Sequence, residues 1–360
     1  MSSSYGEKLK ITIFGQSHSA SIGVIIEGIP SGVKIDTEAL LAFMSRRAPG
    51  KNPLSTKRHE ADIPNFTAGL VDGITCGTPI CAIINNTDTK SGDYENIRDI
   101  PRPSHADYSA FLKFGKSHDI RGGGHFSGRL TAPLCIAGAI AIQILKEKNI
   151  FIGAHISSIK NISDSRFDKV KTDKSLLQKL TAKDFSVLDD KIADKMKTVI
   201  TNASSDGDSV GGTIECAVVG LAGGIGQGIF GGLENRISQA IFGIPAIKGI
   251  EFGNGFEAAE LFGSENNDEY IIDQDNNIVT KTNNHGGILG GLSSGMPLVF
   301  RVAVKPTPSI SKVQNSVRLS DMTETKLEIK GRHDPCIVPR AVPCVEAAAA
   351  LAILDAIYCN

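Results

Sequence analysis

Three observations predict an α+β fold for this sequence. Short apolar segments typical of strands, and longer segments typical of helices, occur in both halves of the 360-residue chain. Many of the 38 glycines fall in clusters between apolar runs, where they indicate tight turns or backbone close to a ligand. No long low-complexity linker divides the chain, so we expect residues 1–360 to form a single domain.

Strands are expected where short apolar runs are rich in β-branched residues. The runs are 11–14, 22–29, 210–219, 247–252 and 298–304. A strand, a glycine-containing turn and a helix follow one another in 23–46 and again in 212–242. This similarity between the two halves is faint, and it indicates an internal pseudo-repeat.

Helices are expected at 37–46, 131–148, 233–242 and 343–358. Thr37 is placed to cap the first helix, and Pro343 to open the last, alanine-rich one. The apolar stretch 132–145 is too short, and too interrupted by glycine, to cross a bilayer, so we interpret it as a buried helix. The polar, charged residues 161–197 are expected to form a helical insertion on the surface.

Composition excludes several classes of protein. The formal net charge is -1, whereas a dedicated nucleic-acid binder usually has a basic excess. Seven cysteines without paired spacing fit a reducing cytosol, and Cys76 and Cys81 lack the second pair that a zinc site needs. Residues 1–10 are polar and contain no apolar signal core, so we expect a cytoplasmic protein.

The most informative segment is 330–336, in which Arg332, His333 and Asp334 lie between a glycine and a proline. This combination suits a rigid loop that presents an anion-binding group beside a titratable pair. A related turn at 14–19 places His18 at the end of a predicted strand. An ordinary turn histidine is an equally good interpretation of His18 alone.

Arginines recur in the other turns. Arg46 and Arg47 precede a Pro-Gly turn, and Arg58 follows shortly after. Their guanidinium groups could bind carboxylate or phosphate, although arginine at a helix end is also explained by the helix dipole. In 101–107, two prolines stiffen the backbone around Arg102 beside His105, and Asp107 could orient that imidazole.

The segment 121–129 joins three consecutive glycines to His125, Ser127 and Arg129, directly before the predicted helix at 131. Backbone amides in such a loop favour anions. The segment matches neither the phosphate loop of nucleotide hydrolases nor the dinucleotide fingerprint. For His125, a structural or stacking role is at least as well supported as catalysis.

Residues 305–309 follow a predicted strand and combine a lysine, two hydroxyls and two prolines, which together could hold a phosphate. The glycine-rich stretch 284–295 would allow close approach of backbone, and His285 within it is best interpreted as a turn histidine. The sequence has no cluster with metal-ligand spacing and no GxSxG nucleophile elbow. The excess of arginine over carboxylate in these turns favours a polyanionic ligand.

Together these segments resemble the chorismate synthase family, over nearly the whole chain. The similarity rests on Phe14-Gly15-Gln16-Ser17-His18, Arg102-Pro103-Ser104-His105-Ala106-Asp107, Gly331 to Cys336, and Arg340-Ala341-Val342-Pro343. It implies a lyase that converts 5-enolpyruvylshikimate 3-phosphate to chorismate and phosphate by 1,4-anti elimination, the last step of the shikimate pathway and part of aromatic amino-acid biosynthesis. It also implies reduced FMN as cofactor, a sandwich of helices between antiparallel β-sheets, and a homotetramer.

The resemblance assigns roles residue by residue. The implied catalytic residues are His18, His105, Asp334 and Ser127. Those implied to hold substrate anions are Arg47, Arg58, Arg102, Arg129 and Arg332. Those implied to line the flavin are His125, Phe126, Ser127, Pro245, Ala246, Gly290, Lys305, Pro306, Thr307, Pro308, Ser309 and Arg332.

The chain departs from the family pattern at several positions. Gln16 replaces a usual Glu, Ser19 a Gly, His125-Phe126 an Arg-Ser, Leu130 a Glu, and Pro245 an Asn. Pro53 lies near a position where some members place an arginine linked to NADPH, so an NADPH site would depend on Arg47 alone. No reductase module is visible, and many family members take reduced flavin from an external reductase.

Two other functions are compatible with the same residues. The departures at Gln16 and His125-Phe126 suggest a flavin or anion binder that has lost activity. A phosphate-ester hydrolase would also use arginines and histidines, but it would release phosphate without flavin.

Overall fold

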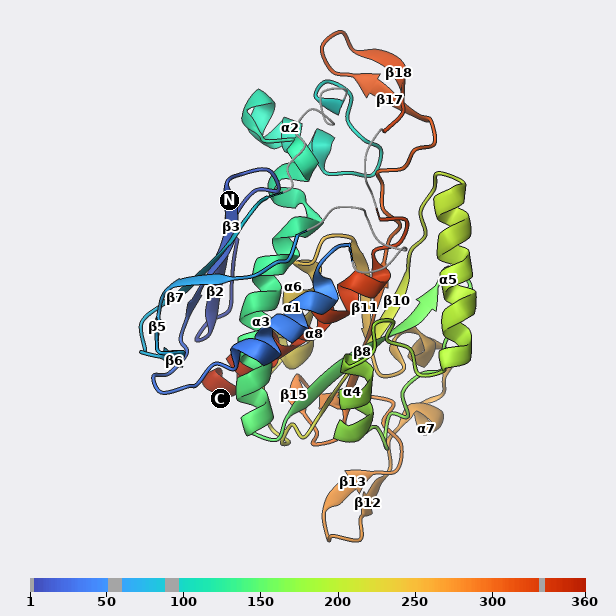
Figure 1. Cartoon of the computed structure of the whole chain (residues 1–360). Helices are drawn as coiled ribbons and strands as arrows, with labels where there is room; N and C mark the ends of the chain where they lie inside the picture. Colours follow the sequence, from blue (N-terminus) through green and yellow to red (C-terminus); the bar gives the residue numbers. More distant parts are fainter. Residues whose placement is uncertain (1–2, 51–59, 88–96, 330–333) are drawn as a thin grey trace.

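A layer of helices lies between two antiparallel sheets in the computed structural model, which describes residues 3–50, 60–87, 97–329 and 334–360 (Figure 1). The predicted α+β class and the sandwich of helices between sheets are confirmed. The layer is apolar on both sides because its two longest helices bury side chains around most of their circumference. A helix can do this only when other elements cover it on every side.

The two main sheets contain the predicted strands. The first has the spatial order β1 (Ser4–Tyr5), β2 (Lys10–Gly15), β3 (Ser21–Glu27), β7 (Ile80–Asn85) and β4 (Asn65–Ala68). The second has the order β11 (Ile247–Phe252), β16 (Leu298–Val304), β10 (Gly212–Val219), β8 (Phe151–Ile159) and β9 (Ile162–Ser163). Shorter hairpins are β5 (Leu70–Val71) with β6 (Ile74–Thr75), β12 (Tyr270–Ile272) with β13 (Ile278–Thr280), β14 (Ile288–Leu289) with β15 (Leu292–Ser293), and β17 (Gln314–Arg318) with β18 (Thr323–Leu327).

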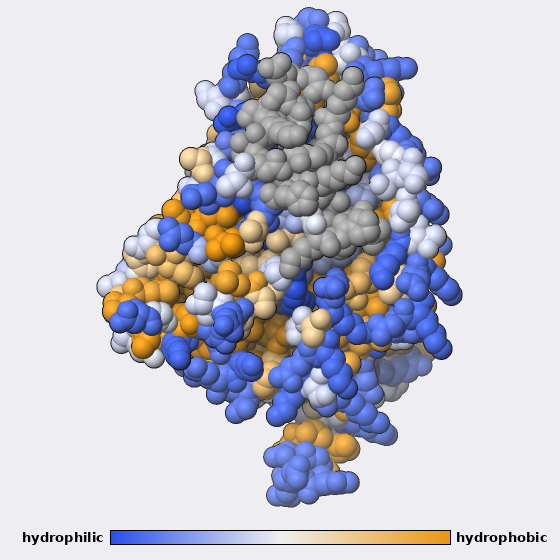
Figure 2. All heavy atoms as spheres, viewed as in Figure 1, coloured by the Kyte–Doolittle hydropathy of each residue, from blue (hydrophilic) through white to orange (hydrophobic). Residues whose placement is uncertain are grey.

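The inner layer consists of α1 (Thr37–Arg47), α3 (Thr131–Glu147), α6 (Leu233–Phe242) and α8 (Val338–Cys359). The helix α3 packs on the first sheet, and α8 packs on β8 and β10 of the second. Outside this layer lie α2 (Asp107–Phe114), α4 (Lys174–Thr181), α5 (Asp190–Ser205) and α7 (Gly263–Asn266). The hairpin β12–β13 projects away from the rest of the chain and exposes apolar side chains (Figures 1 and 2).

Two expected helix starts are wrong. Thr37 is the first helical residue of α1, and the cap is Asp36, whose side chain accepts a hydrogen bond from the Ala39 amide at 3.0 Å. The last helix begins at Val338, so Pro343 lies inside it. The helix can start earlier because the proline in its first turn is Pro339. Amides in the first turn have no partner within the helix, so a proline there costs no hydrogen bond.

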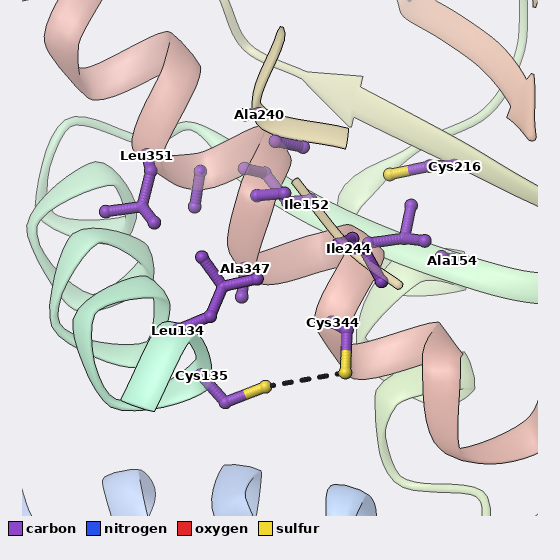
Figure 3. Packing of buried hydrophobic residues seen from close by; sticks show 14 of the residues in the cluster. Leu134, Cys135, Ile152, Ala154, Cys216, Ala240, Ile244, Cys344, Ala347 and Leu351 are labelled. Carbon is purple, nitrogen blue, oxygen red and sulfur yellow. Dashed lines mark hydrogen bonds between the residues drawn. The ribbon is translucent and has the colours of Figure 1, made fainter. Parts of the chain in front are cut away.

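The closest packing in the layer is between α3 and α8. A Cβ on Gly138 would overlap the side chain of Ala347, so glycine is required for this approach. One turn away, the sulfur of Cys135 lies 3.8 Å from that of Cys344 (Figure 3). Both helices pass a length-and-hydropathy test for membrane spans, at Gly128–Glu147 and Val338–Cys359, but 83% of each tested window is buried. The buried helix expected at 132–145 is therefore confirmed.

The two sheets repeat one topology. In the first half, β2, β3, α1, β4, β7 and α3 follow in chain order, and the strands lie in the order β2-β3-β7-β4. In the second half, β8, β10, α6, β11, β16 and α8 follow in the same way, and the strands lie in the order β8-β10-β16-β11. The pseudo-repeat expected from 23–46 and 212–242 corresponds to β3–α1 and β10–α6.

A second pair of segments shows the repeat, and their sequences are more similar than those of the pair we expected. Residues 69–80 read GLVDGITCGTPI, and 287–298 read GILGGLSSGMPL. Each segment forms a hairpin with a two-residue turn, and the two hairpins have the same register: Leu70 pairs with Thr75, and Ile288 with Ser293. Each hairpin is followed by a strand of a main sheet, β7 in the first half and β16 in the second. The aligned glycines all have positive φ, which explains why these positions keep glycine in both copies.

The region 161–197 is largely helical, as expected, because α4 and the start of α5 lie in it. It is not merely a surface addition: Leu177 and Leu180 of α4 pack with Ala217 and Val299 on the outer face of the second sheet. The inner layer has one continuous apolar cluster that extends from Leu9 to Ala356. This shared core is why we propose a single domain for residues 1–360.

A buried histidine joins the insertion to the second sheet. The Nδ1 atom of His155 lies 3.3 Å from Asp164 Oδ2, and its Nε2 atom lies 3.0 Å from Glu215 Oε2. Burial by itself lowers the pKa of this imidazole, but the hydrogen bonds to the two carboxylates outweigh burial and raise the pKa of His155 above its usual 6.5.

We predict that His155 stabilises the fold most at acidic pH. Its contribution is fully present below pH 6.5 and is lost as pH rises through the raised folded-state pKa. His155→Gln should therefore lower the free energy of unfolding by about 3–5 kcal/mol at pH 6 and by less at pH 8.5. Urea denaturation at both pH values measures this difference.

His118→Gln is the matched control, because the Nδ1 atom of that ring pairs with the Gly115 carbonyl at 2.9 Å instead of with carboxylates. If His155→Gln lowers the free energy of unfolding by the same amount at both pH values, the raised pKa of His155 is contradicted.

Candidate functional site

The candidate site lies at the end of the helix layer where α1 ends and α3 and α8 begin (Figure 1). Arg47, the last residue of α1, donates from Nε to Thr131 Oγ1 at the start of α3, at 3.1 Å. Its carbonyl accepts a hydrogen bond from Nε of Arg340 in α8, at 2.9 Å. The segments between β7 and α3, and between β16 and α8, lead into the same end. They are equivalent in the two halves of the pseudo-repeat.

A glycine loop brings two histidines together. A Cβ on Gly122 would lie 2.5 Å from both His18 Cε1 and Ser17 Oγ. A Cβ on the next residue, Gly123, would lie 3.1 Å from Cε1 and Nε2 of His105. The two imidazoles therefore contact successive residues of one loop, although 87 positions separate them in the sequence. Both glycines have positive φ and leave no room for a side chain.

A carboxylate and an arginine hold the His105 ring. Its Nδ1 atom lies 2.6 Å from Asp107 Oδ1, so Nε2 is the nitrogen that faces Gly123. Asp107 also accepts a hydrogen bond from Arg102 Nε at 2.7 Å, and Arg102 Nη1 donates to Ser309 Oγ at 3.2 Å. Burial lowers the pKa of His105 and Arg102 lowers it further, against the hydrogen bond to Asp107. These effects together favour the neutral form of the imidazole.

The Lys305 segment lies against the same turn. Lys305 Nζ donates to the carbonyl of Ser104, and its amide donates to the carbonyl of Ala246 at 3.0 Å. Ala246 has φ +75, an uncommon conformation for a residue with a side chain. The hydroxyl of Thr307 is buried and has no hydrogen-bond partner among the described residues. The predicted flavin-lining residues 245–246 and 305–309 therefore lie beside the His105 turn.

A buried charge cluster forms the opposite part of the site. Nη1 of Arg47 and Nη1 of Arg129 both donate to the carboxylate of Asp62. Glu60 Oε2 lies 2.9 Å from Arg129 Nε. Burial alone would raise the pKa of Asp62, but the guanidinium groups of Arg47 and Arg129 hold it below its usual value. Two positive and two negative charges thus offset one another in a site closed to water.

Asn86 connects this cluster to the His18 turn. Its Oδ1 atom accepts a hydrogen bond from Arg129 Nε at 3.1 Å. Its Nδ2 group donates to the carbonyls of Ser19, at 2.8 Å, and of Gln16, at 3.3 Å. The position of His18 relative to Arg129 is therefore set by one amide side chain at the end of β7.

Asp334 and Ser127 join the same network. Asp334 forms an ion pair with Arg340, which in turn contacts the carbonyl of Arg47. Ser127 Oγ accepts a hydrogen bond from the amide of Arg129 at 3.3 Å. Four other residues singled out in the sequence, Pro53, Arg58, Arg332 and His333, lie outside the described residues.

The remaining predicted residues have protein contacts of their own. The His125 ring pairs through Nδ1 with the Gly15 carbonyl at 2.8 Å and through Nε2 with Ser3 Oγ at 2.6 Å. Phe126 is 37% exposed, with its ring centroid 6.5 Å from that of Phe114. Gly290 lies in the turn of hairpin β14–β15. The His125 contacts fit the structural role that we considered beside a catalytic one.

Sequence reasoning missed Asp62, Glu60 and Asn86, and it quoted Ser17 without a role. One signal for the two carboxylates was present: they follow Arg58 by two and four positions in a charged segment. Asn86 carried no distinguishing pattern. Ser17 is completely buried, and its hydroxyl has no partner among the described residues.

Comparison with known proteins agrees with this geometry. A family model described as chorismate synthase matches residues 9–358. Chorismate synthase of Lancefieldella parvula is 46% identical over 99% of this chain and 97% of the relative, and that of Pyrococcus abyssi is 44% identical over 97% and 96%. A crystal structure of chorismate synthase superposes with a TM-score of 0.76 at 26% identity, over 98% of this chain and 92% of the other.

Fold and site thus define an enzyme whose candidate site gathers arginine and histidine side chains at one end of the helix layer. The chain belongs to the chorismate synthase family, the lyases that catalyse the last step of the shikimate pathway.

We predict that Gly122→Ala abolishes most activity by displacing His18. The new methyl group would overlap both His18 and Ser17, so turnover should fall about 100-fold or more. Gly115→Ala is the control: Gly115 has φ +60, almost the same as Gly122 at +59, but no atom lies within 4 Å of its added Cβ. At Gly115 ψ is −146, against 18 at Gly122, so Gly115→Ala carries the greater backbone strain of the two variants. Equal activity losses in the two would show that strain, not the position of His18, is responsible.

Proposed function

We propose that this chain converts 5-enolpyruvylshikimate 3-phosphate to chorismate and phosphate by 1,4-anti elimination, with reduced FMN. One observation carries the proposal: the rings of His18 and His105 contact successive glycines of a single loop, beside buried arginines. Such an arrangement suits a reaction in which a phosphate leaves and a proton is removed within one pocket.

The substrate has two carboxylates and a phosphate, and the site offers matching donors. Arg129 is 5% exposed, and its Nη2 atom is buried without a hydrogen-bond partner among the described residues. A buried donor in this state costs free energy unless a ligand accepts from it. We propose that Arg129 holds a substrate anion, together with Arg58 and Arg332. The guanidinium nitrogens of Arg102 bond to Asp107, Ser309 and His105, so we propose that Arg102 acts on the substrate through His105.

The residues around His105 fit a flavin phosphate and ring. Lys305 contacts the His105 turn through the Ser104 carbonyl and bonds to the Ala246 carbonyl, and the buried Thr307 hydroxyl, which has no partner among the described residues, follows two positions later. Ser127 lies near the His105 ring at Gly123, where an added Cβ would be 3.8 Å from Ser127 Cβ and 3.1 Å from His105 Nε2. When bound, reduced FMN would supply electron density to the substrate transiently and recover it.

The side chains divide the proton transfers between them. His18 would donate a proton to the departing phosphate. His105 would exchange a proton at Nε2, because Asp107 occupies its Nδ1. Asp334 and Ser127 would assist proton movement near the flavin.

We also propose a cytoplasmic homotetramer that receives its flavin already reduced by an external reductase. Arg47 would be the contact for NADPH, but its Nε, Nη1 and Nη2 atoms bond to Thr131, Asp62 and the carbonyl of Gly128. A guanidinium with three protein partners leaves little for a second anion. This favours an outside source of reducing equivalents.

Phosphate release without air tests the reaction. With substrate and reduced FMN, the protein should release phosphate and chorismate in equal amounts, and with oxidised FMN it should release neither. Phosphate release that needs no flavin would indicate a hydrolase. Flavin binding without any product would indicate a binding protein that has lost catalysis.

We predict that His105→Ala and His18→Ala each lower turnover by about 10²–10⁴-fold, because each removes a group that moves a proton. Steady-state rates measure the loss, and circular dichroism checks the fold. His285→Ala is the control, because His285 lies in another part of the chain, where its Nδ1 atom is 3.3 Å from Asp268 Oδ2. Wild-type rates in both test variants would remove these histidines from the mechanism.

A further inference from the structure

Among the described residues, Asp62 is the one carboxylate that contacts two of the arginines assigned to substrate anions. Its side chain is fully buried, and the side chains of Arg47 and Arg129 are only 4% and 3% exposed. Fifteen positions separate Asp62 from Arg47, and 67 separate it from Arg129. The fold, not local sequence, therefore selects this arrangement.

The backbone at Asp62 supports a special role. Its φ is +52, in the left-handed region that residues with side chains seldom adopt. Such a conformation costs about 1–3 kcal/mol and persists where surrounding contacts hold it. Here those contacts are the two ion pairs.

The two arginines differ in what they can still bind. Arg47 uses each of its three guanidinium nitrogens on a protein partner. Arg129 uses Nε on Glu60 and Asn86 and Nη1 on Asp62, which leaves Nη2 without a partner among the described residues. Of the two, Arg129 is the one with a guanidinium nitrogen that lacks a partner among the described residues, and its other bonds fix the direction in which that nitrogen points.

A ligand anion could bind to these two arginines in two ways: by displacing Asp62, or by binding beside it at Arg129 Nη2. To displace Asp62, an anion would have to break ion pairs to two buried guanidinium groups at once. To bind at Nη2, it has to reach a buried atom, but it breaks no ion pair among the described residues. The geometry favours a carboxylate that stays in place while the ligand binds beside it.

We propose that Asp62 is a positioning residue for substrate binding: its carboxylate fixes the Arg129 guanidinium so that Nη2 faces a substrate anion, and Arg47 acts through Asp62 by holding it in place. This inference rests on the proposed function only for the identity of the substrate. It assigns Arg47 an indirect role in place of direct contact with the substrate.

The isosteric variant Asp62→Asn tests the proposal. Its amide keeps the shape of the side chain but loses the charge that aligns the two guanidinium groups. We expect the Kd for 5-enolpyruvylshikimate 3-phosphate, titrated calorimetrically without flavin, and the KM to rise about 10- to 100-fold. We expect kcat to change by less than about threefold, because Asp62 does not touch the reacting atoms. A merely structural loss would lower the active fraction and leave KM unchanged.

Glu346→Gln is the matched control. Glu346 is also a fully buried carboxylate, and it forms an ion pair with the neighbouring Arg46 and accepts a hydrogen bond from the Ala154 amide at 3.0 Å. Removing its charge should lower the melting temperature and leave Kd and KM near the wild-type values. If Asp62→Asn does not fold, Asp62→Glu keeps the charge, moves the carboxylate by one methylene, and should still raise KM.

The outcomes separate the inference from the proposed function. If wild-type protein fails to bind 5-enolpyruvylshikimate 3-phosphate, the proposed function fails, and inorganic phosphate becomes the probe. Phosphate should then raise the melting temperature of the wild type and of Glu346→Gln, but not that of Asp62→Asn. Equal affinities of wild type and Asp62→Asn for the probe would overturn the inference. Tighter binding by Asp62→Asn would also overturn it, because Asp62 would then be a competitor of the ligand.

Discussion

The close packing of α3 against α8 is the constraint on which the rest of the structure depends. Gly138 lets the two helices approach until its Cα faces the side chain of Ala347, and the apolar layer around them contacts both sheets. Because this crossing is fixed, the first residues of both helices lie at one end of the layer. The segments that precede them therefore converge there and carry the catalytic candidates.

The pseudo-repeat explains why one site contains residues from both halves. The segment after β7 holds Arg102, His105 and Arg129, and the equivalent segment after β16 holds Lys305, Ser309 and Asp334. Each leads into a helix of the shared layer. Two copies of one topology thus supply two different loops to one site, where Lys305 and Ser309 of the second loop contact Ser104 and Arg102 of the first.

Charge balance is the second organising feature. Several arginines cannot be buried together without counter-charges, because like charges in a medium of low polarity repel strongly. Asp62, Glu60 and Asp107 supply those counter-charges within the protein. Arg129 Nη2 is the donor of this cluster that stays without a partner in the described part of the chain. Buried arginines are therefore balanced by carboxylates within the described part of the site.

The amino-acid sequence by itself determined the strands, the main helices, the positions of the histidine and arginine turns, and the family. These features depend on periodicity and on motifs within about ten residues, so they can be read locally. The tertiary structure decided that Gly122 lies against His18, that Asp62 joins Arg47 to Arg129, and that the last helix starts at Val338. Partners far apart in sequence are chosen by packing and by the need to neutralise buried charge, and neither leaves a pattern in any short segment.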